Sequence, residues 1–166
     1  EMVAERAHSK GALLIVVWYP IAAGFLKTPG ACGADIVVGD GQPLGIPLSF
    51  GGPYLGFIGT KKRYIHNLAG RIVGRTVDTE GKEAFVLTLQ AREQHIKREK
   101  ASSNICSNQA LAALRAAIYL SLMGESGLKQ VATMSFNRAH ALHDALVKTG
   151  SVTSAFPQPF FNEFSL

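Results

Sequence analysis

Two short, mainly apolar runs constrain the fold of this chain more than any other feature. Residues 12–17 and 34–38 are rich in Val, Ile, Leu and Ala, and apolar and polar side chains do not alternate along them. Such runs are typical of strands that are covered on both faces, as in the parallel sheets of α/β proteins. A helical pattern over residues 1–9 precedes the first run, and a third apolar segment lies near residues 56–60. This order of helix and short strands predicts an α/β architecture.

The middle of the chain predicts a β-hairpin. Residues 71–77 and 84–89 both have the composition of strands, and residues 78–81 between them supply turn-forming Asp and Gly. Two such runs joined by a short turn are the sequence pattern of an antiparallel pair.

Two helices are predicted after the hairpin. The first covers residues 108–123 and is apolar nearly all round, which favours a buried helix that ends at Gly124. The second begins after Ser126, which can cap it, runs to Lys148 and is stopped by Gly150. We expect its inner stripe to consist of Leu128, Val131, Ala139, Leu142 and Leu146.

Composition and charge narrow the class of protein. The chain is 47% hydrophobic and 17% charged, which predicts a globular protein, and the longest uncharged apolar stretch is interrupted by Pro20 and too short to span a membrane. A formal net charge of +5 favours a solvated face or an acidic partner over nucleic acid. Cys32 and Cys106 are far apart, which argues against a disulfide framework or a zinc site and indicates a reducing cytoplasm. We expect Cys106 to be a buried, inert thiol, and we expect the chain to be a fragment, because both ends look cut.

Three motifs have the residue types of a known site but not its spacing. The glycine-rich run 39–45 follows a strand but lacks the dinucleotide-binding pattern, and the Gly and Lys of residues 56–61 do not form a phosphate-binding loop. His140 and His143 lie three residues apart with Asp144 beside them, but no third metal ligand is evident. We therefore predict no metal site and a solvated helix face at the histidines.

A basic and polar cluster leaves two interpretations open. Basic residues of this cluster are offset by Glu93 and Glu99, and residues 102–104 add polar side chains. The cluster is either a solvated linker, whose ion pairs contribute little to stability, or a surface whose donors bind a ligand or a facing backbone. The candidate site residues are Arg92, Arg98, Lys100 and Asn104.

Three long runs carry a resemblance to a known family. Residues 34–61 read ADIVVGDGQPLGIPLSFGGPYLGFIGTK, residues 70–78 read GRIVGRTVD, and residues 87–107 read LTLQAREQHIKREKASSNICS. Together they resemble the P-protein of the glycine cleavage system (glycine dehydrogenase, decarboxylating) in its subunit-1 form. The resemblance extends from about residue 10 to the end of the chain.

This resemblance implies a partial fold-type-I pyridoxal-phosphate-dependent transferase fold. Residues 1–122 would hold the late strands of the large domain with the linker helix, and residues 123–166 would begin the small domain. The family is an oxidoreductase of glycine catabolism that decarboxylates glycine and transfers an aminomethyl group to the lipoyl arm of H-protein. The implied partners are therefore subunit 2, lipoylated H-protein and glycine, in a cytoplasmic heterotetramer.

The resemblance also implies that this chain does not itself carry the cofactor. Aligning residues 46–53 with the glycine-rich run that follows the Schiff-base lysine of subunit 2 puts Gln42 at the lysine position, and an amide nitrogen does not attack an aldehyde. Tyr19 stands where the fold usually has an Asp that pairs with the pyridinium nitrogen, and a neutral phenol is a poor counter-ion. We expect no catalytic and no cofactor-binding residue here, pyridoxal phosphate held by subunit 2, and no activity from this fragment alone.

Two other interpretations stay open. The chain could be a stand-alone binding or scaffold module with a degenerate pyridoxal-phosphate fold, in which case no lysine-bearing partner would be recovered with it. It could also belong to a pyridoxal enzyme whose lysine lies outside these residues, in which case the full-length chain alone would absorb as an aldimine.

Overall fold

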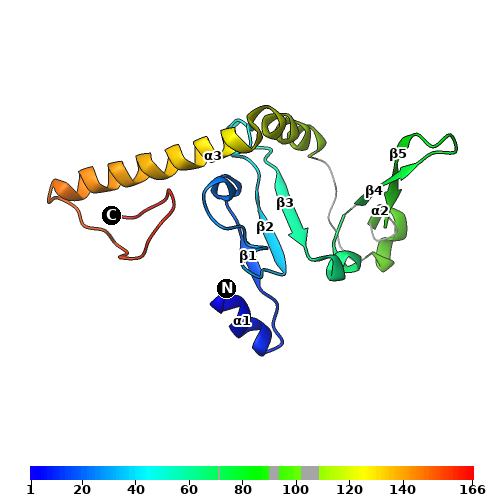
Figure 1. Ribbon diagram of the computed structural model, residues 1–166, viewed down its shortest axis with the longest axis horizontal. Coiled ribbons are helices and arrows are strands. Elements are labelled where there is room, and N and C mark those ends of the chain that lie inside the picture. The colour runs from blue at the N-terminus through cyan, green and yellow to red at the C-terminus, as the bar shows by residue number, and fades with distance from the viewer. Residues whose placement is uncertain (71, 90–93, 102–108) are drawn as a thin grey trace. The chain divides into compact units, whose positions relative to one another are not determined.

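The computed structural model describes residues 1–70, 72–89, 94–101 and 109–166 (Figure 1). The chain forms two compact units, one made of Glu1–Ile58 with Leu111–Leu166 and the other of Gly59–Ala110. The predicted division into a large domain up to residue 122 and a small domain after it stays a prediction. No helix within the described ranges is both long and apolar enough to cross a membrane.

A three-stranded sheet organises the first part of the chain. Its strands are β1 (Ile15–Val17), β2 (Ile36–Asp40) and β3 (Gly56–Thr60), in the order β1-β2-β3. β1 and β2 are parallel, with Ile15 opposite Ile36 and Val17 opposite Val38. The helix α1 (Met2–Ser9) precedes the sheet, and the 3-10 helix η1 (Pro20–Gly24) follows β1. The predicted helix, strands and α/β architecture are confirmed.

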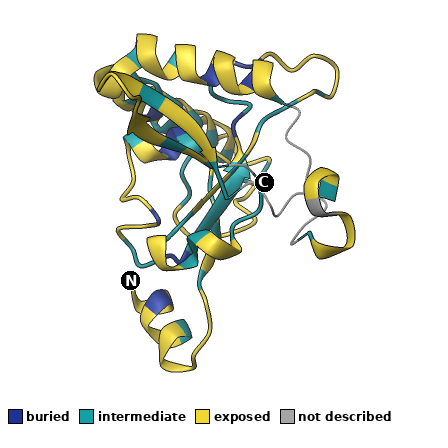
Figure 2. Ribbon diagram, turned by 90° about the vertical axis from the view of Figure 1, so that its right-hand side faces the viewer, coloured by how far each residue is buried: buried dark blue, intermediate teal, exposed yellow. Residues whose placement is uncertain are grey.

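The strands are less covered than their composition predicts. Along β1, Ile15 is 56% exposed and Val17 is 81% exposed, whereas β2 is half-buried along residues 36–39. The prediction that the first strand is covered on both faces is therefore wrong for this chain. β1 lies at an edge of the sheet, and Figure 2 shows exposed residues along much of the described chain.

Close backbone contact holds the sheet together at Gly39. A Cβ atom on this residue would lie 2.3 Å from the carbonyl oxygen of Trp18 and 2.5 Å from the ring of Phe57. The same restriction applies where η1 meets the long helix, because a Cβ on Gly24 would lie 2.5 Å from the carbonyl oxygen of Leu128. Only glycine allows these approaches without displacing backbone.

The helix α3 (Ala110–Lys148) is two helices joined at a kink. Gly124 interrupts it with φ 59° and ψ −171°, and Gly150 follows its end with φ 74°. The predicted stop at Gly124 and the predicted end at Lys148 are both confirmed. Glycine is suited to both positions because it adopts positive φ without steric cost.

The first half of α3 is not the buried helix that its composition predicts. Ala112 and Ala116 are buried, but Leu111 is 70% exposed and Leu122 is 81% exposed. One face of this helix packs inward, as the tight approach of Gly45 to the ring of Tyr119 shows. The opposite apolar face is not covered by any residue that the structure describes, so the prediction fails on that face.

The second half of α3 has an inner face that differs from the predicted stripe. Leu128, Val131 and Ala139 are half-buried as expected, but Leu142 and Leu146 are exposed. Ala132 is fully buried instead. The inner face therefore matches the predicted stripe as far as Ala139, and beyond it His143 and Val147 are half-buried in place of Leu142 and Leu146, where Phe160 of the chain after the helix packs against His143.

The second unit contains the predicted hairpin. β4 (Ile72–Val77) and β5 (Glu83–Thr88) are antiparallel, with Val73 opposite Leu87 and Arg75 opposite Phe85. Asp78 builds the turn, since its carboxylate accepts hydrogen bonds from the backbone N–H groups of Glu80 and Lys82 at 2.8 and 2.9 Å. The other elements are η2 (Lys62–Asn67), α2 (Gln94–Lys97) and η4 (Arg98–Lys100). None of the described residues between 59 and 110 is buried.

Candidate functional site

The carboxyl ends of the two parallel strands are the place where a sheet of this kind binds ligands. Trp18 and Tyr19 follow β1 directly, and the loop 41–55 follows β2. A hollow of about 270 Å³ lies at the end of β1. Its lining residues are Trp18, Tyr19, Ala22, Leu26, Phe161, Asn162 and Glu163.

Tyr19 is one wall of this hollow and belongs to a cluster of aromatic rings. Its ring centre is 6.3 Å from that of Phe161, and the ring of Phe25 stacks on Phe136 at 4.6 Å. The side chain is 39% exposed. Tyr19, which the alignment places where the fold usually has an Asp that pairs with the pyridinium nitrogen, therefore contributes an aromatic surface to this hollow.

Gln42 is committed to the loop that contains it. Its backbone N–H donates to the Asp40 carboxylate at 2.7 Å, and its side-chain amide nitrogen donates to the carbonyl oxygen of Ile46 at 2.7 Å. This pair of hydrogen bonds fixes the turn at the carboxyl end of β2. An amide in this role holds backbone and offers no nucleophile.

None of the described residues that line this hollow can form a Schiff base with pyridoxal phosphate. Schiff-base formation needs a primary amine, and the described residues that line the hollow include no lysine. The position that the alignment gives to the lysine holds the hydrogen-bonded Gln42. We therefore assign this chain no catalytic step through that cofactor.

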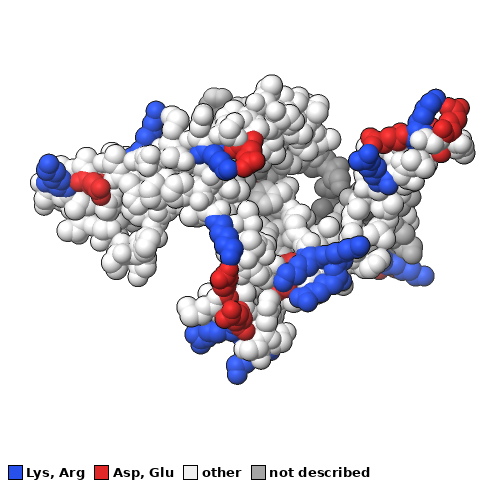
Figure 3. Space-filling view, in the orientation of Figure 1, with Lys and Arg blue, Asp and Glu red and all other residues white. Residues whose placement is uncertain are grey.

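The candidate basic cluster is only partly within the described residues. Arg98 and Lys100 lie together in η4, and both are exposed. Arg98 helps to line a shallow hollow with Gln94, His95 and Glu99. Arg92 and Asn104 lie outside the described residues, as does Cys106. On the face drawn in Figure 3, Lys and Arg occur in small groups with acidic residues near several of them.

The two histidines of α3 pack against the chain that follows the helix. The ring of His140 stacks on Phe160 at 4.0 Å with 4° between the planes, and its Nε2 lies 3.1 Å from the carbonyl oxygen of Phe160. The side chain of His143 is only 16% exposed, and its Nδ1 lies 3.0 Å from the carboxylate of Asp144. The prediction of a solvated helix face is therefore wrong. Within the described ranges, no group of three or more His, Cys, Asp or Glu side chains could hold a metal ion.

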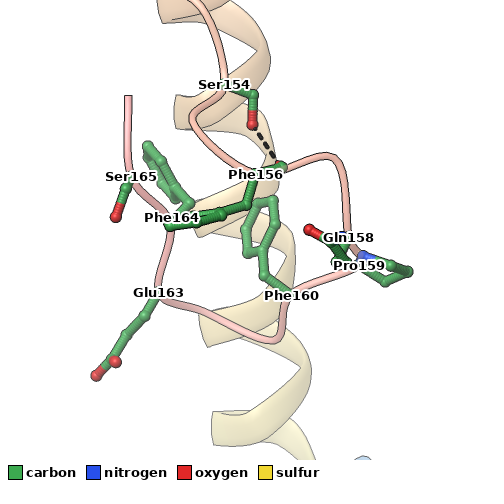
Figure 4. Close-up of a pocket in the computed structure, with 8 residues that line it drawn as sticks. All are labelled: Ser154, Phe156, Gln158, Pro159, Phe160, Glu163, Phe164 and Ser165. Atoms are coloured by element: carbon green, nitrogen blue, oxygen red, sulfur yellow. Dashed lines mark hydrogen bonds between the residues drawn. The ribbon is translucent and has the colours of Figure 1, made fainter.

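The segment that covers these histidines encloses a second hollow, of about 420 Å³ (Figure 4). Phe160 and Phe164 line it, and the Ser154 hydroxyl donates to the carbonyl oxygen of Phe156 at 2.9 Å. Glu163 is the one ionisable residue among the described residues that line it. The hollow therefore offers an aromatic surface but no set of groups for acid–base chemistry.

Sequence reasoning missed two residues with marked environments. The Asp35 side chain is fully buried, and its Oδ2 lies 2.6 Å from Nε2 of His8 and accepts the backbone N–H of Leu14 at 2.9 Å. Phe50 is fully exposed, at 111% of its reference area. A carboxylate inside an apolar run and an aromatic ring between glycines and prolines are the signals that could have identified them.

Comparison with known proteins gives a consistent match. The family model described as glycine cleavage system P-protein matches residues 1–166. A protein of Desulforamulus reducens, named probable glycine dehydrogenase (decarboxylating) subunit 1, is 58% identical over 99% of this chain and 37% of its own length. A protein of the same name from Citrifermentans bemidjiense is 55% identical over the same shares. The chain thus spans 37% of the length of these relatives.

A solved structure agrees with the sequence relatives. The chain is similar to a crystal structure of glycine decarboxylase (P-protein) of the glycine cleavage system in inhibitor-bound form, with a TM-score of 0.92 and 54% identity. The match covers 97% of this chain and 37% of that one. A match of this quality confirms the predicted α/β fold.

Proposed function

Because this chain belongs to the glycine cleavage system P-protein family, we propose that it is part of subunit 1 of a glycine-decarboxylating enzyme. In this proposal the enzyme releases CO₂ from glycine and transfers the aminomethyl group to the lipoyl arm of H-protein. The observation that carries the proposal is the family match over residues 1–166, together with two relatives that are both named subunit 1.

The cofactor is assigned to the partner subunit. Gln42 supports this assignment, because its amide is held by the carbonyl oxygen of Ile46 at the position that the alignment gives to the Schiff-base lysine. In this proposal subunit 1 contributes contact surface to the complex, and subunit 2 supplies the lysine that binds the cofactor. We propose the cytoplasm as its location, on the strength of its cysteine usage.

The experiment that tests this function compares the two intact subunits alone and mixed. We expect CO₂ release from glycine, in the presence of lipoylated H-protein, only from the mixture. We expect aldimine absorbance from subunit 2 and none from subunit 1 alone. Borohydride reduction followed by peptide mapping should label a lysine of subunit 2.

Two other results would replace the proposal. An aldimine on subunit 1 alone, with a labelled lysine in that subunit, would show that it carries its own cofactor. Failure of subunit 1 to associate with subunit 2 or to support activity would favour a separate binding or scaffold module.

We further propose that the basic cluster lines the mouth of the active site or the contact between subunits. Its members Arg98 and Lys100 are exposed and lie two residues apart in η4, and charge-assisted hydrogen bonds from such side chains suit a carboxylate or phosphate. Arg92 and Asn104 complete the proposed set.

Replacing Arg98 by alanine in the assembled complex tests this role. Loss of a charge-assisted hydrogen bond should lower kcat/KM, or the affinity between subunits, by about 10-fold to 100-fold. The matched control is Arg138→Ala, since Arg138 is an exposed arginine on α3. If activity and assembly of the Arg98 variant both equal those of the control, the cluster is a solvated linker.

A further inference from the structure

We draw no further inference here: the strongest candidate, the exposed apolar patch around Phe50 in the loop between β2 and β3, carries nothing, because the chain spans 37% of the length of its relatives and nothing in the structure shows whether the rest of the same subunit or another subunit covers this loop.

Discussion

Replacing Gly39 by alanine is expected to lower the free energy of unfolding of the intact subunit by about 3 kcal/mol, the upper part of the range for overpacked cores. The added Cβ would lie 2.3 Å from the carbonyl oxygen of Trp18 and 2.5 Å from the ring of Phe57. The oxygen belongs to backbone that also donates a hydrogen bond from the Trp18 N–H to Val38 at 2.8 Å, so it cannot move away freely. Guanidinium unfolding followed by circular dichroism would measure the loss.

A glycine of the neighbouring strand provides the control. Gly56 begins β3, and a Cβ atom placed on it would meet nothing within 4 Å. Gly56→Ala should therefore change the free energy of unfolding by less than about 0.5 kcal/mol. Equal losses for the two variants would mean that glycine's backbone freedom, rather than the space around Gly39, is what the sheet requires.

Replacing Asp35 by alanine is expected to destabilise the intact subunit by about 3 kcal/mol. The Asp35 side chain is fully buried and joins three segments: the residues just before β2, the His8 ring of α1 and the Leu14 N–H just before β1. Alanine would leave the half-buried Leu14 N–H without this acceptor and release α1 from the sheet. Chemical unfolding measures the loss, and hydrogen exchange at Leu14 should accelerate.

Arg6→Ala is the matched change on α1. Arg6 is exposed on the same helix that carries His8, so the free energy of unfolding should stay within about 0.5 kcal/mol of the wild type. If Asp35→Ala were no more harmful than Arg6→Ala, the hydrogen bonds of the Asp35 carboxylate would not be what fixes α1.

Local chemistry explains which elements could be predicted from the sequence. The hairpin turn follows from Asp78, whose carboxylate accepts two backbone N–H groups, and the break in α3 follows from Gly124. Each of these features depends on residues that are neighbours along the chain. Membership of the P-protein family could be predicted for the same reason, because the resemblance depends on continuous runs of sequence. The family match confirms it.

Burial could not be predicted in the same way, because it depends on what lies opposite. Leu111 and Val17 are residue types that are usually found in a core, but both are exposed here. His143 is a type usually found at the surface, but the chain after α3 largely covers it. The left-handed backbone at Phe50 could not be predicted from the sequence either. It is accompanied by hydrogen bonds that several groups of its loop donate to a single carbonyl oxygen. These features arise from long-range packing and from backbone geometry that residue patterns do not specify.

The hairpin of β4 and β5 carries exposed apolar side chains that favour association between copies of the chain. One face of this two-stranded ribbon carries Val73, Val77, Phe85 and Leu87, with exposures from 36% to 66%. A lone ribbon of two strands is marginally stable in water, and its unpaired edges accept strands of other molecules. Copies in which this ribbon stays uncovered would associate with one another through it and become substrates for chaperones and proteases. An uncovered ribbon of this kind is therefore the place where self-association of this chain would be expected to begin.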